Sequence, residues 1–253
     1  MRLALRILLT IVVIAAIVFV CACGALFAFQ RSLIYYPQPR SNTEASTLMT
    51  LPGGVNVSTL PRSTPDAVLY FGGNAEDVSL DAPDFADAFP HSAIYLLHYP
   101  GYGGSSGSPT QRAIFAAALA LYDRVHAGHP NVTVIGRSLG TGVAVWIAIQ
   151  RPVVRLVLIT PYDSLGDAAA AQYPFLPVRW LLLDKYESWR YAPEVAAPTR
   201  ILVAADDEVI PRSSSDRLRT RFRSGLLSYV LIPGASHNTI QNAPNYWTLL
   251  TSP

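Results

Sequence analysis

Apolar runs of two different lengths divide this chain. The first extends from Ile7 to Phe29 without a charged residue, and as a helix it is long enough to cross the roughly 30 Å hydrocarbon core of a bilayer. Six shorter apolar runs, of four to seven residues each, follow after residue 66. The pattern predicts a membrane-anchoring helix in residues 1–31 and one folded domain in residues 32–253.

The six shorter runs alternate with stretches of helical character. The expected strands are Ala67–Phe71, Ala93–Leu97, Val132–Ile135, Val153–Ile159, Arg200–Ala204 and Tyr229–Ile232. The clearest helices expected between them are Gln111–Ala127, Leu139–Gln150 and Ser213–Phe222. Strands that are apolar throughout are buried on both faces, which is typical of a mostly parallel sheet covered by helices. The sequence therefore predicts an α/β fold.

Two segments follow this alternation less well. Residues 32–66 hold short apolar pieces, Leu33–Tyr36 and Val55–Leu60, separated by prolines and two adjacent glycines, so we expect a few edge strands there. Residues 162–191 are rich in aromatic residues and proline. We predict that this second segment is an insertion that lies over the strand ends as a short lid.

The N-terminal apolar run has two further interpretations. One is a cleaved secretory signal, although the apolar core of such a signal is normally only about 7–15 residues long. The other is a lipoprotein signal with a lipidated Cys23, although Cys21 makes that pattern atypical. Arg2 and Arg6 precede the run and give a slight bias toward a cytoplasmic N-terminus. We expect a single-pass membrane protein with an uncleaved signal anchor and its folded domain on the extracytoplasmic side.

Charge and cysteine content narrow the classes of function. The formal net charge is +2, and the basic residues form no stripe interleaved with aromatics, which argues against nucleic acid as a partner. Both cysteines lie in the N-terminal apolar run, so the folded domain has no disulfide. No sequence motif for a metal or an organic cofactor is present, and we expect no cofactor.

A serine between two glycines is the strongest chemical signal. Ser138 directly follows an expected strand, opens an expected helix and has Gly136 and Gly140 two residues away on either side. A sharp turn that exposes the serine Oγ needs close backbone approach, which glycine allows. The alternative is a plain glycine-rich loop. The position between a strand and a helix favours a nucleophile.

A nucleophilic serine needs a base, and the base needs an orienting carboxylate. His237 is the only one of the five histidines that follows the last expected strand. Asp207, in the loop after the strand that ends at Ala204, is our preferred acid, with Asp206 and Asp163 as alternatives. The order serine, aspartate, histidine, each after a strand, is that of a hydrolase on a parallel sheet.

The nucleophile also needs donors for the oxyanion of the transition state. One expected donor is the backbone N–H of Leu139, at the positive end of the helix that begins there. The other is the backbone N–H of Asn74, in a loop that follows the first long strand and contains two glycines. A simple loop without this role is the alternative interpretation of that segment.

Five segments resemble the α/β-hydrolase superfamily, and more narrowly its membrane-anchored α/β-hydrolase-domain proteins: Gly72–Ala75, Tyr99–Pro109, Gly136–Gly140, Asp207–Pro211 and Ser236–Asn238. The match covers roughly residues 33–250. Some members of this group remove palmitate from protein cysteines. The chain departs from the group at Pro100, where arginine is usual, and at Gly72, where histidine is usual. The glycine at position 72 lies in the loop that carries Asn74, so it bears on the geometry of the expected oxyanion donor.

The resemblance implies a serine hydrolase that acts on carboxylic esters or thioesters. A membrane anchor and the aromatic residues of 162–191 favour lipidic substrates or acylated proteins, although the same aromatics are also typical of an ordinary core. Two rival functions use the same fold: a catalytically inactive, membrane-tethered binding module, and a peptidase or acyltransferase. Fold and catalytic residues alone do not specify the substrate.

Overall fold

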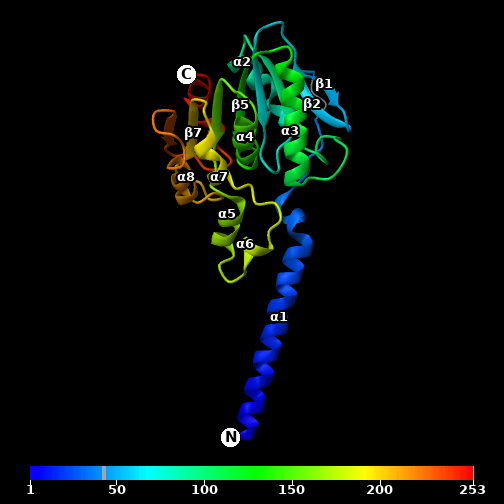
Figure 1. Cartoon of the computed structure of the whole chain (residues 1–253), viewed down its shortest axis with the longest axis vertical. Helices are drawn as coiled ribbons and strands as arrows, with labels where there is room; N and C mark the ends of the chain where they lie inside the picture. The colour runs from blue at the N-terminus through cyan, green and yellow to red at the C-terminus, as the bar shows by residue number, and fades with distance from the viewer. Residues whose placement is uncertain (42–43, 253) are drawn as a thin grey trace.

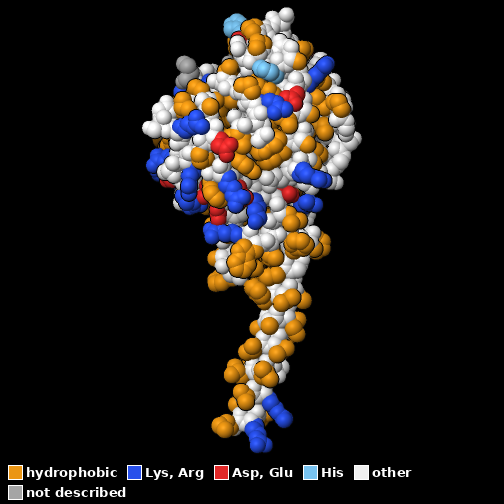
Figure 2. Space-filling model, viewed as in Figure 1, with side chains coloured by type: hydrophobic (Ala, Val, Ile, Leu, Met, Phe, Trp, Pro, Cys, Tyr) orange, Lys and Arg blue, Asp and Glu red, His pale blue; other side chains and the backbone are white. Residues whose placement is uncertain are grey.

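A computed structural model of the chain describes residues 1–41 and 44–252 and has two parts, a long N-terminal helix and an α/β domain (Figure 1). The helix, α1, extends over Arg2–Ile34. By length and composition it is long and apolar enough to cross a membrane. Hydrophobic side chains cover it almost end to end, and basic side chains mark its free end (Figure 2).

The domain is built on one sheet, which has eight strands among the described residues, in the order β1-β2-β4-β3-β5-β6-β7-β8. The strands from β3 to β8 pair in parallel, whereas β1 pairs antiparallel with β2, and β2 pairs antiparallel with β4. The strands are β1 (Thr47–Leu51), β2 (Val55–Leu60), β3 (Asp66–Phe71), β4 (Ala93–Leu97), β5 (Asn131–Arg137), β6 (Arg155–Ile159), β7 (Thr199–Ala204) and β8 (Leu227–Ile232).

Helices cover both faces of the sheet. Alternate residues of β3 show this, because Leu69 and Phe71 belong to one core and Val68 and Tyr70 to the other. Helices α3 and α4 pack on the first face, and α2 and α9 pack on the second. The helices after α1 are η1 (Val78–Asp81), α2 (Ala82–Ala88), α3 (Gln111–His126), α4 (Leu139–Gln150), α5 (Leu165–Gln172), α6 (Val178–Leu181), α7 (Ser188–Tyr191), η2 (Ala192–Glu194), α8 (Arg212–Arg219), η3 (Ile240–Asn242) and α9 (Tyr246–Thr251). The predicted α/β fold with a mostly parallel sheet is confirmed.

One local prediction is wrong. Leu33 and Ile34 do not begin an edge strand but form the end of α1, and the chain becomes extended only at Tyr35. Pro37 follows shortly afterwards, and the residue before a proline disfavours helical geometry. The outermost strand is instead β1, and most of its residues are exposed.

The segment predicted as an insertion forms the short helices α5, α6 and α7. Helix α6 and the loop after it lie beside the last turns of α1 (Figure 1). The exposed side chains of residues 162–191 include four large apolar ones, Tyr173, Phe175, Trp180 and Leu183. Residues 162–191 therefore pack against the end of the apolar helix. Their function as a lid remains a proposal.

Candidate active site

Ser138 occupies a strained turn between β5 and α4. Its backbone has φ 48° and ψ −116°, a region that side chains other than glycine rarely adopt. The turn is tight because α4 approaches the neighbouring strand β3 closely. A Cβ atom added at Gly140 would lie 1.9 Å from the carbonyl oxygen of Phe71, and one at Gly136 would lie 2.4 Å from the carbonyl oxygen of Gly140. Only glycine fits at these two positions.

Three loops at the carboxyl ends of the strands bring the candidate serine, histidine and aspartate together. The Oγ atom of Ser138 lies 2.9 Å from Nε2 of His237. The other ring nitrogen of His237, Nδ1, lies 3.0 and 2.9 Å from the two carboxylate oxygens of Asp207. The histidine and aspartate side chains are only 7% and 3% exposed. Because a carboxylate only accepts, Nδ1 carries the hydrogen and Nε2 is left to accept the serine proton.

The Asp207 carboxylate is itself held in place by the loop that carries it. Its Oδ1 atom accepts hydrogen bonds from the backbone N–H groups of Val209 (2.9 Å) and Ile210 (2.7 Å). The backbone N–H of His237 donates to Glu208 at 3.2 Å, which ties the two loops together. These bonds orient the carboxylate toward the imidazole before any substrate is bound.

The two alternative acids face elsewhere. Asp206 is exposed, and its backbone N–H donates to the carbonyl of Ala235. Asp163 accepts a hydrogen bond from Ser214 and forms an ion pair with Arg217, both at 2.5 Å, so it anchors α8. Among the described residues, neither carboxylate has a hydrogen bond to the imidazole that Asp207 contacts.

The loop that carries Asn74 is fixed by bonds to several segments. The carbonyl of Asn74 accepts from Tyr102 Oη (2.7 Å) and from the backbone N–H of Tyr36 (3.1 Å), and its side-chain amide donates to the carbonyl of Ile34 (3.0 Å). Within the described part of the chain, the backbone N–H groups of Asn74 and Leu139 have no hydrogen-bond acceptor. Both residues line the same cavity as Ser138. Their function as oxyanion donors stays a prediction.

The glycine at position 72 is explained by the space around it. A Cβ atom there would lie 2.5 Å from Cγ1 of Val78 and 3.0 Å from a carboxylate oxygen of Glu76. The carbonyl of Gly72 accepts a hydrogen bond from Tyr99 Oη at 2.8 Å. The loop is therefore held by tyrosine hydroxyls and by Glu76, with no room for the histidine that is usual at this position.

Two cavities meet at Ser138. The first, of about 280 Å³, has no charged side chain in its lining and is walled mainly by apolar residues of α1, α5 and α6; we call it the apolar cavity. The second, of about 330 Å³, is lined by Glu76, Arg137, His237 and Asn238; we call it the polar cavity. Ser138 lines both, so a substrate with one apolar and one polar arm would place its junction at the hydroxyl.

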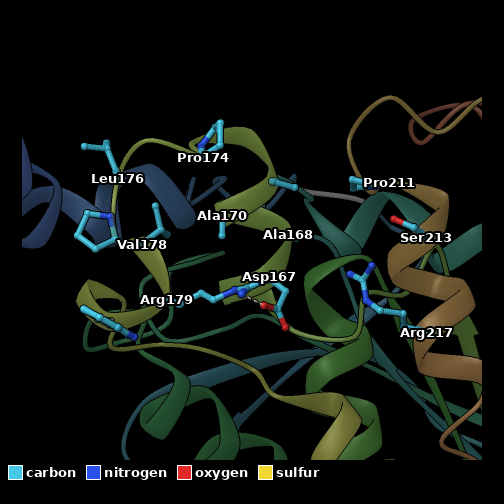
Figure 3. A pocket seen from close by; sticks show the side chains of 13 residues that line it. Asp167, Ala168, Ala170, Pro174, Leu176, Val178, Arg179, Pro211, Ser213 and Arg217 are labelled. Carbon is cyan, nitrogen blue, oxygen red and sulfur yellow. Dashed lines mark ion pairs between the residues drawn. The ribbon is translucent and has the colours of Figure 1, made fainter.

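A larger pocket, of about 670 Å³, lies between the α5–α6 segment and the start of α8 (Figure 3). An ion pair between Asp167 and Arg179, at 2.5 Å, crosses it. Neither Ser138 nor His237 lines this pocket, so its size does not make it the active site. In residues 1–41 and 44–252, no group of three or more His, Cys, Asp or Glu side chains is arranged to hold a metal ion.

A buried polar network supports the floor of the site, and the sequence reasoning missed it. Glu76 accepts hydrogen bonds from Tyr70 Oη (2.5 Å) and the backbone N–H of Gly73 (2.8 Å), and it pairs with Arg137 at 2.8 Å. Burial raises the pKa of Glu76, but the Arg137 charge and these hydrogen bonds together lower it by more. The pKa of Glu76 therefore lies below its ordinary value. The only local signal was an acidic residue close to Asn74 and a basic one beside the serine.

Asp81 is the second carboxyl group of this network. Burial, together with the neighbouring Glu76 carboxylate, raises the pKa of Asp81 to about 9. A hydrogen bond between the side chains of Asp81 and Glu76 also raises this pKa, because only a protonated Asp81 can donate to the Glu76 carboxylate. At neutral pH the folded protein therefore keeps a proton on Asp81, whereas an unfolded chain loses it above a pH of about 4.

Replacing Asp81 with asparagine is expected to make the protein less sensitive to alkaline pH. In the wild type, the folded state holds a proton that the unfolded state releases. The contribution of Asp81 to the free energy of unfolding is therefore fully present below about pH 4 and falls as pH rises toward 9, by at most about 1.4 kcal/mol per pH unit. D81N has no such proton. Thermal unfolding between pH 5 and 9 should show the melting temperature of D81N rising relative to that of the wild type as pH rises. The exposed control D87N should keep a constant offset from the wild type, because Asp87 is not among the groups that shift the pKa of Asp81. Equal pH slopes for D81N and the wild type would contradict this assignment.

The chain is similar to several known proteins. A family model described as alpha/beta hydrolase fold matches residues 66–192. An uncharacterized protein of Mycobacterium tuberculosis is 34% identical over 248 residues, which cover 89% of this chain and 87% of that protein. Lysophosphatidylserine lipase ABHD12 of Danio rerio is 26% identical over 211 residues, covering 70% of this chain and 55% of that protein. Human alpha/beta hydrolase domain-containing protein 17B is 28% identical over 189 residues, covering 71% and 64%.

Solved structures show the same fold at low sequence identity. The Pyrococcus furiosus esterase Pf2001 superposes with a TM-score of 0.66 at 16% identity, covering 85% of this chain and 95% of the esterase. Mouse alpha/beta hydrolase domain-containing protein 10 superposes with a TM-score of 0.62 at 20% identity, covering 81% and 95%. The family model covers half of this chain, residues 66–192, and this chain therefore belongs to the alpha/beta hydrolase family.

Proposed function

We propose that this chain is a serine hydrolase that cleaves carboxylic ester or thioester bonds, with Ser138 as nucleophile, His237 as general base and Asp207 as the residue that orients it. The observation that carries the proposal is the unbroken hydrogen-bond chain from the Ser138 hydroxyl through His237 to the Asp207 carboxylate, beside the apolar cavity. Residues of these three types in this geometry activate a hydroxyl that is otherwise a weak nucleophile.

The reaction has two halves. In the first, Nε2 of His237 takes the proton from Ser138 while Oγ bonds to the substrate carbonyl carbon, and the carbonyl oxygen becomes an oxyanion between the N–H groups of Asn74 and Leu139. The oxyanion collapses, the bond to the alcohol or thiol breaks, and His237 returns the proton to that leaving group. In the second half, water attacks the acyl-enzyme, His237 takes its proton, and the acid leaves as Ser138 regains its hydrogen.

The preferred substrate class is an amphiphilic ester or thioester with a single acyl chain. The apolar cavity has room for one chain, and the polar cavity on the other side of Ser138 suits the polar leaving group. The name of the relative ABHD12, a lysophosphatidylserine lipase, supports a lipid ester. An acylated protein presented at a membrane would offer the same chemistry.

The proposal includes a membrane location. We infer that α1 spans a bilayer, that residues 32–253 form the hydrolase domain on the extracytoplasmic side, and that residues 162–191 form a lid. The length and apolar composition of α1 support the span. The orientation rests on Arg2 and Arg6 at the start of the helix, which favour a cytoplasmic N-terminus.

A fluorophosphonate probe tests the nucleophile and the orientation together. The full chain in detergent should react with the probe, S138A should not, and the control S213A, which removes an exposed hydroxyl in the larger pocket, should label like the wild type. Labelling of S138A would reject Ser138 as nucleophile, and no labelling of the wild type would favour an inactive binding module. A membrane-impermeant probe should label intact cells, and labelling only after lysis would reverse the orientation.

Ester, thioester and amide substrates separate the proposed activity from its rivals. The wild type should release the leaving group from p-nitrophenyl esters and acyl thioesters, and S138A should not. Cleavage of aminoacyl amides in preference to both would indicate a peptidase. Transfer of the acyl group to an added alcohol in preference to water would indicate an acyltransferase.

A further inference from the structure

The last turns of α1 are part of the folded domain rather than a free tether. Residues 1–22 of the chain are all exposed, and the residues of α1 that are partly or wholly buried lie at positions 23, 26, 30 and 34. This spacing of three and four residues places Cys23, Leu26, Gln30 and Ile34 along one stripe of the helix. One stripe of the helix end therefore packs on the domain, while the opposite side stays exposed.

Gln30 fixes the helix end to the segment that follows α6. It is the only residue of α1 classed as buried, with 3% of its surface exposed. Its side-chain oxygen accepts from the backbone N–H of Leu183 at 2.7 Å, and its side-chain nitrogen donates to the carbonyls of Phe27 (2.9 Å) and Leu181 (3.2 Å). A buried amide with all these partners holds one relative position, because breaking them leaves polar groups unpaired.

Two further contacts connect the end of α1 to the segment after α6. Asp184 accepts a hydrogen bond from Tyr35 Oη at 3.1 Å and forms an ion pair with Arg31 at 3.3 Å. The Asp184 side chain is buried, whereas Arg31 is half exposed. The helix end is therefore connected to the segment after α6 by side chains from two successive turns.

The same helix end lines the apolar cavity. Leu26, Gln30, Leu33 and Ile34 contribute to its wall, and Ser138 and Leu139 lie in the wall as well. Leu33 and Tyr173 line the cavity although they are 53% and 54% exposed, so the cavity opens between α1 and α5. A chain that enters here passes along the helix that is proposed to sit in the bilayer.

We infer that the last turns of α1 are part of the substrate-binding site, where Leu26 and its neighbours bind the acyl chain and limit its length. This inference rests on the proposed function, because it concerns the substrate of the same serine. It assigns the membrane helix a second task besides anchoring. The mouth between α1 and α5 lets a single-chain amphiphile move its acyl chain from the leaflet to Ser138 without crossing water.

Substitutions at Leu26 in opposite directions test the inference. In the full chain in nanodiscs, kcat/KM is measured with p-nitrophenyl butyrate, octanoate and dodecanoate for the wild type, L26W and L26A. Each methylene that the indole excludes from the cavity should lower the dodecanoate-to-butyrate ratio about fourfold. We expect L26W to lower this ratio at least tenfold. L26A, which enlarges the cavity, should raise it above the wild-type value.

The matched control is F29W, which adds an indole three residues away on the exposed side of the same helix. Its ratio should stay within about twofold of the wild type. Equal ratios for L26W, L26A and the wild type would overturn the inference, as would a shift in F29W as large as in L26W. If L26W does not fold, the L26A ratio alone decides the outcome. The proposed function fails separately, when the wild type hydrolyses none of the three esters or S138A hydrolyses them equally well.

Discussion

Alanine in place of Ser138 or His237 is expected to lower kcat for ester hydrolysis by about six orders of magnitude. The serine hydroxyl lies 2.9 Å from Nε2 of His237, and neither group can perform its step without the other. For the same reason the two losses are not additive, and the double variant should be no slower than either single one by more than about tenfold. Single-turnover measurements with a p-nitrophenyl ester check both statements.

Asparagine in place of Asp207 should cost less, about 10⁴-fold in kcat. The amide can donate to Nδ1 of His237 and so favours the tautomer in which Nε2 carries the hydrogen, which blocks proton transfer from the serine. The matched control is D206N, because Asp206 is adjacent in sequence but exposed, and it should stay within about twofold of the wild type. A large loss of kcat in D206N with little loss in D207N would instead make Asp206 the residue that orients His237.

Alanine in place of Gly140 is expected to destabilise the protein by about 3 kcal/mol or more, the second large effect. In an ordinary helix this change would stabilise by up to about 1 kcal/mol. Here the new Cβ would lie 1.9 Å from the carbonyl oxygen of Phe71 and 2.5 Å from its carbonyl carbon. These are backbone atoms of β3, which is paired on both sides within the sheet, so neither α4 nor β3 can move away cheaply.

Thermal unfolding checks this expectation, with G128A as the control. An added Cβ at Gly128 meets nothing closer than 4.0 Å, so that variant should unfold within a few degrees of the wild type. G140A should unfold about 6–12 °C lower, at about 2–4 °C for each kcal/mol in a domain of this size. Equal melting temperatures for G140A and G128A would contradict the close approach of Gly140 to the backbone of β3.

Local signals in the sequence were enough for the elements and for the candidate residues. The length of the apolar run predicted α1, and the apolar strands predicted the parallel part of the sheet, because strands that are buried on both faces consist mostly of apolar residues. Ser138 was recognisable because the glycines around it mark a tight turn after a strand. Asp207 and His237 were selected by their order after later strands, since the carboxyl ends of parallel strands lie at one edge of a sheet. Their catalytic roles remain predictions.

Other features depend on contacts between residues far apart in the chain. Leu33 and Ile34 have the composition of a strand, yet they continue α1 because the helix end packs against the domain and Gln30 bonds to a segment about 150 residues later. Strand β1 lies at the sheet edge, where one neighbour suffices and apolar residues are not required. No local pattern reports such pairings, because each contact is made by a partner that only the fold brings near.

By itself, the sequence determined that this chain has an apolar helix of membrane-spanning length and a hydrolase-type α/β domain, because hydrophobic periodicity and glycine-flanked turns are local properties. Only the tertiary structure decided that Glu76, Asp81 and Arg137 share one buried network, and that Leu26 and Gln30 form a wall of the cavity beside Ser138. The physical reason is that burial, ion pairing and cavity shape are properties of groups distant in sequence. They exist only once the chain has folded.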